Sequence, residues 1–404
     1  MVVVAETTAP RLTAADDDAA LIARARKLAP IFASRAAAHD RDGSFAFENF
    51  QDLFDAGLLS LTVPTALGGH GAGARTTLRV LGIIAGADPS TALVLAMHYI
   101  QHFVMARNKE YPLRLARKLA RESVEAGALI NTLRVEPALG SPSRGGLPET
   151  TARRTETGWR LTGRKIYSTG PPILKWYSVW AKTDETKTDE TKTSEAGPRL
   201  GLFLVPAGLP GIRIVETWDH LGLRASGSHD VIFEDVVIPL DYEIELRQPQ
   251  EWRVPDPVQA MVHAVFVGAI YDGIARAARD WLVDFLKTRT PSSLGAPLST
   301  LPRAQEILGA IEARLQVNAR LIDSVAREFD EGVVPGAVES NLIKLAVTNN
   351  AVDAVGDALS LSSNHGLSRS NPLERHYRDV LCGRVHTPQD DATRTAAGRL
   401  VLGL

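Results

Sequence analysis

The sequence has little of several features that would place it in a class at once. It contains a single cysteine, Cys382, which excludes an internal disulfide and fits a reducing compartment. No apolar run approaches the length of about eighteen residues typical of a membrane-spanning helix. The first six residues also lack the basic region and apolar core of a signal peptide. We therefore expect a cytoplasmic protein without a membrane anchor.

Neither sign of charge prevails in the chain. The formal net charge is -2 at pH 7 and the isoelectric point is near 6.6. This balance argues against a dedicated nucleic-acid-binding protein. A small organic molecule is the partner that we expect, with no nucleic acid and no membrane.

What is present is typical of a soluble globular protein. The chain has 404 residues, of which 45% are hydrophobic and 23% charged, so it can form two or three domains with a large core. The patterning predicts an N-terminal helical domain over residues 1–126, a central β domain over 127–246 and a C-terminal helical bundle over 247–404.

Helical and strand periodicities alternate along the chain. Between residues 59 and 64 we expect an extended segment, and between 68 and 73 a plain loop despite its glycines. A tandem charged repeat at 182–193 predicts a hairpin tip without chemistry. The helices predicted are 14–38, 47–56, 76–87, 89–107, 258–287, 301–329, 337–361 and 390–402, and the strands include 159–162, 179–181, 202–205, 212–214 and 231–233.

The stretch 129–170 organises the rest of the chain. We interpret it as two short strands joined by a loop, rich in small hydroxyl and amide side chains. Such side chains beside exposed backbone suit the edge of a planar ring with several hydrogen-bond acceptors, and Tyr167 offers a flat face for stacking. Composition alone is equally typical of an ordinary loop.

Four ordered motifs resemble those of the acyl-CoA dehydrogenase superfamily. They are EPALGS at 136–141, KIYST at 165–169, GLRASGS followed by VIFEDVVIP at 222–239, and ERHYRD at 374–379. The resemblance implies an α+β fold with an N-terminal helical domain, a central β domain and a C-terminal four-helix bundle. It also implies a flavin between the β domain and the bundle.

The resemblance includes one departure that bears on the reaction. In the commonest dehydrogenase pattern, the glutamate that removes the substrate proton follows the Arg-Asp pair by eight residues. Counting from Asp379 gives Thr387, which cannot act as a base. An acyl-CoA dehydrogenase or oxidase would need a displaced carboxylate, for which the region of Asp272 is one possibility. This remains the alternative function.

RVHTP at 384–388 resembles the flavin-dependent monooxygenase branch, which includes dibenzothiophene and sulfone monooxygenases. That likeness implies a two-component enzyme. In such an enzyme a separate NAD(P)H:flavin reductase would supply FMNH2 or FADH2, and O2 would react to give a C4a-hydroperoxyflavin that oxygenates a small substrate at an atom such as sulfur or nitrogen. The catalytic residues implied are His386, as an acid or base titrating near neutrality, Ser168, His98 and His102.

The same resemblance assigns cofactor contacts. Asn131, Tyr167, Ser168 and Thr169 would bind the flavin ring, and Ser141 the phosphate end. Arg289 would reach a cofactor phosphate, often across a dimer interface. The aromatic residue usual after that arginine is missing, which favours reduced FMN over FAD. The remaining contacts implied are Asn364, His365, Gly366 and Arg369, and the assembly implied is a homodimer or homotetramer.

The pair His98 and His102 has other interpretations. Four residues apart on one predicted helix, the two imidazoles project from the same face. Two histidines without a third ligand make a weak metal site, so we predict no metal and leave a structural role open beside the catalytic one. A flavin-containing DNA-binding protein on this fold is a third alternative, although the segment 396–404 offers no basic tail.

Overall fold

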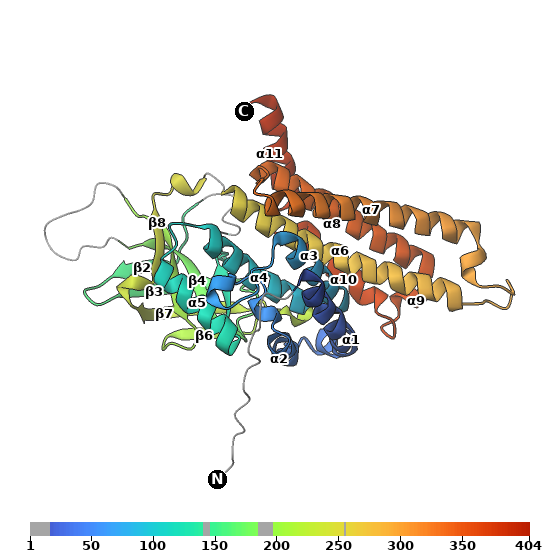
Figure 1. The fold of residues 1–404 in the computed structure, drawn as a ribbon, viewed down its shortest axis with the longest axis horizontal. Coiled ribbons are helices and arrows are strands. Elements are labelled where there is room, and N and C mark those ends of the chain that lie inside the picture. The colour runs from blue at the N-terminus through green and yellow to red at the C-terminus, as the bar shows by residue number, and fades with distance from the viewer. Residues whose placement is uncertain (1–16, 140–145, 185–196, 254–255) are drawn as a thin grey trace, which may run out of the picture.

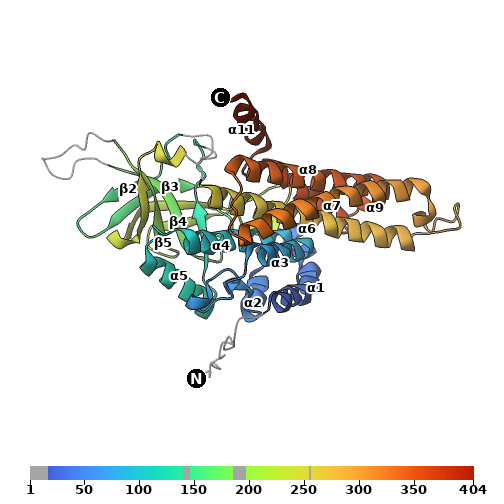
Figure 2. The same ribbon diagram turned by 45° about the horizontal axis from the view of Figure 1, so that its top comes forward.

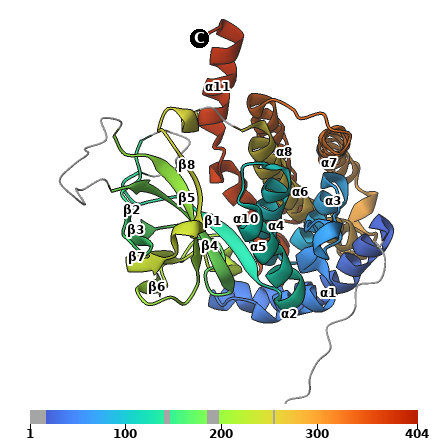
Figure 3. The same ribbon diagram turned by 60° about the vertical axis from the view of Figure 1, so that its left-hand side comes forward.

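The computed structural model describes residues 17–139, 146–184, 197–253 and 256–404. Helices lead into a β sheet, and a bundle of long helices follows, so the predicted α+β architecture is confirmed (Figure 1). Figure 3 shows the sheet on one side of the molecule and the helices on the other. The predicted flavin site lies in the region between these two parts.

The N-terminal part consists of five helices in the described chain: α1 (Asp18–Asp42), α2 (Phe47–Asp55), α3 (Ala74–Ala87), α4 (Pro89–Arg107) and α5 (Leu113–Ala126). The first helix lies further along the chain than the predicted 14–38. Asp17 caps it by accepting a hydrogen bond from the Ala19 N–H, and Gly43 ends it in the left-handed conformation.

Two predictions in this part were wrong or incomplete. Helix α5 was not predicted, although its apolar face buries Leu115 and Leu119 at a spacing of four. The segment 59–64 is not extended, because a 3-10 turn at Leu58–Ser60 buries both of its leucines. Short apolar runs fit either conformation, so the sequence alone did not decide between them.

The described strands are β1 (Leu129–Leu133), β2 (Thr151–Arg154), β3 (Trp159–Lys165), β4 (Leu174–Thr183), β5 (Leu200–Pro206), β6 (Ile212–Val215), β7 (Asp230–Ile238) and β8 (Glu243–Arg247). They form one sheet in the order β6-β7-β3-β2-β4-β5-β8, with β1 parallel to β4 beside it. The stretch 129–170 therefore contributes three strands, where two were predicted.

The C-terminal part contains α6 (Pro257–Thr288), α7 (Pro302–Asp330), α8 (Ala337–Ser362), the short α9 (Asn364–Leu367), α10 (Leu373–Val385) and α11 (Asp390–Leu402). Helices α6, α7, α8 and α10 pack together as the bundle. The helix predicted over 390–402 forms but is not the fourth member of the bundle. It projects from the body of the molecule, and α10 takes that place (Figures 1 and 2).

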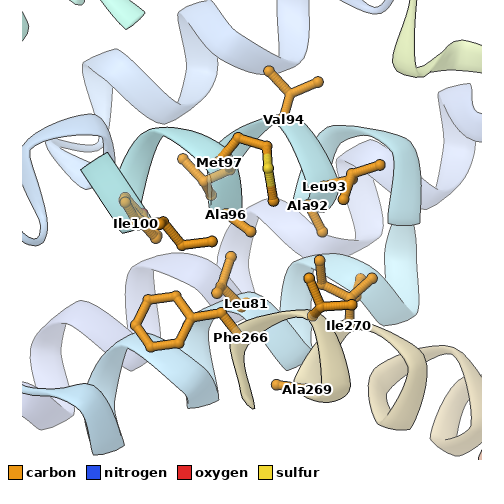
Figure 4. Close-up of a cluster of buried hydrophobic side chains, with 14 of the residues drawn as sticks. Leu81, Ala92, Leu93, Val94, Ala96, Met97, Ile100, Phe266, Ala269 and Ile270 are labelled. Carbon is orange, nitrogen blue, oxygen red and sulfur yellow. The ribbon is translucent and has the colours of Figure 1, made fainter. Parts of the chain in front are cut away.

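The core joins the two helical parts. Helix α4 is buried on nearly every face, and its residues pack with Leu81 of α3 and with Phe266 and Ile270 of α6 (Figure 4). Helix α6 is apolar and long enough to span a membrane by length and composition, yet 78% of its most apolar window is buried inside the protein. Such burial is typical of the central helix of a soluble core.

Candidate functional site

The KIYST segment lies at the end of β3, where the chain turns towards the helices. Tyr167 adopts a positive φ of 53°, an uncommon conformation for a bulky residue that is often found at functional positions. Its side chain is 54% exposed, and its ring lies 5.7 Å from the His220 ring and 6.1 Å from the Trp218 ring. An aromatic face is therefore presented beside Ser168 and Thr169.

A row of small polar groups holds the next residues in place. The Asn131 amide donates to the Thr169 carbonyl at 3.0 Å, and the Thr169 hydroxyl lies 3.1 Å from that of Ser228. Ser228 in turn bonds Ser226 at 2.8 Å. The two serines belong to the GLRASGS motif, but sequence reasoning gave them no role.

Ser168 is the exception in this row. Its side chain is 1% exposed, and its Oγ has no hydrogen-bond partner among the described residues. A buried hydroxyl without a partner is unfavourable by about 1–3 kcal/mol. An unpaired hydroxyl next to an exposed aromatic ring suits a planar ligand with polar edges, and a flavin ring has this character.

A buried ion pair clamps the two motif segments together. Lys165 Nζ lies 2.5 Å from Glu136 Oε1 and also donates to the Trp180 carbonyl. The same carboxylate accepts the Glu149 and Thr150 N–H groups. Burial lowers the pKa of Lys165 to about 8, against the raising effect of Glu136. The pair fixes the start of the loop that carries Ser168.

On the bundle side, His386 follows the last residue of α10. Its Nδ1 lies 3.0 Å from the hydroxyl of Tyr271 on α6, and its ring centroid 6.2 Å from that of His263. Burial lowers the pKa of His386 to about 3, and the charge of Lys344 acts in the same direction. The predicted titration near neutrality is therefore wrong for this geometry, because the imidazole is neutral at pH 7.

Lys344 of α8 holds the segment around His386 in place. Its fully buried ammonium donates to the carbonyls of Gly383, His386 and Pro388 at 2.6, 2.8 and 2.9 Å. The carbonyls at a helix C-terminus carry partial negative charge and attract a cation. Burial nevertheless lowers the pKa of Lys344 to about 8. No sequence signal marked this residue, because its partners lie about forty positions further along the chain.

Arg134, the residue after β1, lies between these two sides. Its charge acts on Lys165 in the β region and on His263 in the bundle, lowering the pKa of both groups. Its Nε is buried and has no partner among the described residues, while its guanidinium lies over the Trp252 ring at 5.7 Å. The sequence alone gave this arginine no function.

The two histidines of α4 differ in their environment. His98 Nε2 lies 3.0 Å from the Leu59 carbonyl, and its Nδ1 accepts the Ile130 N–H at 3.3 Å. Both ring nitrogens are thus engaged with backbone, which favours a structural role. His102 Nε2 is buried without a partner in the described residues. Burial lowers the pKa of both rings, that of His98 to about 4.

The predicted cofactor-tail residues lie elsewhere. Arg289 directly follows α6, and one turn earlier Phe285 packs against the His365 ring at 5.1 Å. His365 sits on α9 with Asn364 and Gly366, at the end of the bundle remote from the sheet, and Arg369 follows this helix (Figure 1). These residues do not meet Ser168 within one chain, and Ser141 lies outside the described residues.

Asp272, the region considered for a displaced base, is occupied by structural contacts. Its carboxylate accepts from Arg276 at 2.7 Å and from Asn318 of α7 at 3.1 Å. Burial raises its pKa, although both partners oppose this shift. The side chain therefore faces α7, whereas its neighbour Tyr271 faces His386. In the described part of the chain, no three His, Cys, Asp or Glu residues gather as a metal cluster.

The β region is fastened to α10 at one further point. Leu223, at a φ of 53°, donates its N–H to Asp379 at 2.7 Å, and a Cβ on Gly222 would collide with the carbonyl of Arg378. Burial raises the pKa of Asp379 to about 7. The aspartate of the Arg-Asp motif thus positions the loop that carries Ser226 and Ser228.

Known protein families match most of the chain. The acyl-CoA dehydrogenase N-terminal domain model matches residues 15–122, the middle domain 134–236 and the C-terminal domain 260–398. The "Putative acyl-CoA dehydrogenase YdbM" of Bacillus subtilis is 34% identical over 91% of this chain and 92% of its own. L-evernosamine nitrososynthase of a Micromonospora species is 30% identical over 93% and 88%.

Solved structures share the fold. KijD3 in complex with FMN and dTDP-3-amino-2,3,6-trideoxy-4-keto-3-methyl-D-glucose is 29% identical, with a TM-score of 0.79 over 97% of this chain and 95% of that chain. The dibenzothiophene monooxygenase TdsC of a Paenibacillus species, solved with FMN and indole, has a TM-score of 0.84 over 96% and 98%. At 20% identity, that likeness shows the fold alone.

Proposed function

This chain belongs to the acyl-CoA dehydrogenase family, and from that premise we propose that it is a flavin-dependent monooxygenase. It uses reduced flavin and O2 to oxygenate a small organic substrate. A separate NAD(P)H:flavin reductase supplies the reduced flavin, and the enzyme works in the cytoplasm as a homo-oligomer. The alternative is a flavin-dependent acyl-CoA dehydrogenase.

One observation carries this choice. A dehydrogenase needs a free carboxylate against its substrate, yet Thr387 occupies the usual position and Asp272 is tied to Arg276 and Asn318. Asp379, in α10, holds the Leu223 N–H instead. Next to Thr387, His386 and its hydrogen-bond partner Tyr271 would supply hydrogen-bond donors rather than a carboxylate.

The residues fit a bound flavin ring on the β side. Tyr167 presents an aromatic face, the buried Ser168 hydroxyl lacks a partner in the described part of the chain, and Thr169 is held by Asn131 and Ser228. Gly170 keeps the loop close to α4, where a Cβ would collide with Val94. When bound, reduced flavin supplies the electrons that activate O2.

The chain's own residues then handle protons and exclude water. If the Tyr271 hydroxyl donates to Nδ1 of His386, the neutral ring carries its hydrogen on Nε2 and can donate it to a bound oxygen atom. Ser168, in the β region, would offer a second donor. Lys344 fixes the backbone of His386 and Pro388, so the imidazole keeps its orientation.

The tail of the cofactor is assigned to a partner subunit. Arg289, Asn364, His365 and Gly366 lie at the end of the bundle remote from the sheet, so a second copy of the chain would have to bring them to the flavin phosphate. Arg369 instead lines a cavity together with His220 of the same chain. Without an aromatic residue after Arg289, we favour FMN over FAD. The nitrososynthase and the KijD3 complex favour an amino sugar oxygenated at nitrogen as the substrate class.

A stopped-flow experiment tests the proposal. The protein is mixed anaerobically with photoreduced FMN and then with air-saturated buffer, and the absorbance of oxidised flavin is followed. We expect a marked delay compared with free reduced FMN. Ser168→Ala and His386→Ala should shorten the delay, whereas two controls in α1, the exposed Ser34→Ala and the half-buried His39→Ala, should leave it unchanged.

The opposite result would favour the dehydrogenase. Reoxidation as fast as that of free flavin, together with anaerobic bleaching of bound oxidised flavin by butyryl-CoA, would contradict the monooxygenase proposal. Such a result would require a carboxylate other than Asp272 to act as the base. Asp272→Asn, which keeps the shape of the side chain, would then lower stability without affecting the bleaching.

A further inference from the structure

A cavity of about 610 Å³ opens beside the N-terminal half of α10, whereas His386 follows the other end of this helix. Its walls are the C-terminal half of α1, the end of α3, the loop 220–224 and the segment 369–378. None of the residues proposed to bind the flavin ring lines it. The cavity is large enough for a small organic ligand.

Arginines dominate the lining. Five of them, Arg41, Arg224, Arg369, Arg375 and Arg378, face two carboxylates. Arg378 accounts for both carboxylates, because it bonds Asp40 at 2.6 Å and Glu374 at 2.8 Å.

Arg224 is also engaged. It donates to the carbonyls of Asp40 and His220 and pairs with Asp219 outside the cavity. The remaining positive charge belongs to Arg41, Arg369 and Arg375. A pocket with this balance favours an anion.

Arg375 is the decisive residue. Its side chain is 7% exposed, and its Nε has no hydrogen-bond partner in the described chain. No ion pair is formed by its guanidinium within the same residues, although Asp379 lies near enough to feel its charge. Its neighbour His376 is 3% exposed with Nδ1 unpartnered, and burial lowers the pKa of that ring to about 3. A buried guanidinium beside a cavity calls for an anionic partner from outside the chain.

We propose that this cavity binds a phosphate or diphosphate group of a small-molecule ligand, with Arg375 as its buried contact. The planar guanidinium matches two oxygens of a phosphoryl group, and Arg41 and Arg369 at the rim can neutralise the others. Ala33, Ala37 and Ala87 leave the rest of the space apolar, which suits the organic part of the ligand.

The cavity lies next to the proposed flavin-ring site and shares none of the ring contacts, although it includes Arg369, which the sequence predicts as a contact of the cofactor tail. His220 lines the cavity, and its ring packs against Tyr167 at 5.7 Å. Two sources of phosphate are therefore within reach, the flavin's own tail and a separate phosphorylated molecule such as a nucleotide-linked substrate. The proposal concerns the phosphate chemistry and does not depend on oxygen transfer.

Binding measured by calorimetry on the full chain tests the proposal. Pyrophosphate, ADP and FMN are titrated at low and at physiological salt into the wild type, Arg375→Gln and the control Arg314→Gln, whose arginine pairs with Asp357 on the bundle surface. We expect at least one probe to bind, and to bind about tenfold or more weakly to Arg375→Gln but not to the control. Salt should weaken binding. Dependence for ADP and pyrophosphate but not FMN would identify a separate phosphorylated ligand, and dependence for FMN alone would identify the flavin tail.

A stability measurement guards against a folding artefact. Because the buried Nε of Arg375 has no partner among the described residues, Arg375→Gln should keep or raise the melting temperature, and phosphate should stabilise the wild type more than the variant. The double variant Arg41→Gln/Arg369→Gln changes only exposed positions and should also weaken binding. Binding of no probe, or equal affinities for the wild type and Arg375→Gln, would overturn the proposal.

Discussion

Two fully buried lysines hold the β region and the bundle side of the candidate site, and the positive charge of each lysine is compensated in a different way. Lys165 in the β region has a carboxylate partner, Glu136, and one backbone carbonyl. Lys344 in the bundle has three backbone carbonyls, and its nearest carboxylate, Asp390, lies 3.8 Å away. Burial lowers the pKa of both to about 8.

The two lysines differ in whether the sequence contains a sign of their partners. A lysine paired with a buried glutamate is a fixed unit, since removing either partner leaves a charge in the interior. A lysine bound to helix-end carbonyls depends only on backbone geometry, so its partners have no sequence signature. The first lysine fixes a loop of the sheet, and the second fixes the position of His386.

Lys165→Met, in the β region, should cause the largest loss of stability. Glu136 would remain buried without its counter-ion, and we expect the free energy of unfolding to fall by ~3–5 kcal/mol in urea denaturation. The double variant Lys165→Met/Glu136→Gln should recover much of this loss. A single-variant loss below ~1 kcal/mol would show that water reaches the pair.

High pH should distinguish the two lysines from ordinary surface lysines. Because folding lowers the pKa of Lys344 from 10.5 to about 8, the unfolded chain binds more protons between these values, and stability from this group rises with pH across the window. The stability of the wild type relative to Lys344→Met should therefore increase by on the order of 3 kcal/mol between pH 8 and 10.5. A flat difference in urea denaturation would contradict the burial of this ammonium.

Lys344→Met at pH 7 should cost less than Lys165→Met. Three carbonyls lose a donor, but no opposite charge is stranded, so we expect a loss of ~1–3 kcal/mol. The segment of His386 should become more mobile, which amide hydrogen exchange of residues 383–388 would detect. If the loss equals that of Lys165→Met, the backbone contacts hold the fold as firmly as the ion pair does.

The neighbouring hydroxyls of Ser168 and Thr169 in the β region should show the smallest difference in stability. Ser168→Ala removes a hydroxyl without a partner and should change stability by ~0.5 kcal/mol or less, or raise it. Thr169→Val removes the bond to Ser228 and should cost ~1 kcal/mol. Thermal unfolding of both variants without flavin checks this order. A larger cost for Ser168→Ala would mean that its hydroxyl serves the fold.

The features that depend on local motifs could be predicted from the sequence. The order of the three parts, most helices and the segments around Ser168 and His386 followed from periodicity and from family motifs. Helix α5 was missed because its many charged residues masked a narrow apolar face. Tyr271, Lys344 and Arg375 could not be assigned roles, since their environments depend on tertiary packing between distant segments.

The titration of His386 could not be predicted for the same reason. An imidazole in a motif has its ordinary pKa until the surrounding packing is known, and here burial makes it neutral. Likewise, Asp272 was a reasonable base from its position in the chain. Only the contacts of its carboxylate with α7 show that it serves the bundle.

The bond from Leu223 to Asp379 has a consequence for how quickly a ligand can enter. It joins the sheet to the bundle through the chain's own atoms, so the spacing between these two segments is set by the protein itself. A ligand that binds between segments already held at this spacing does not have to draw them together, so its arrival would be limited by diffusion and orientation rather than by closure. An enzyme of the proposed kind would have to capture a reduced, oxygen-sensitive flavin before air oxidises it, and a fixed spacing of these two segments would favour rapid capture.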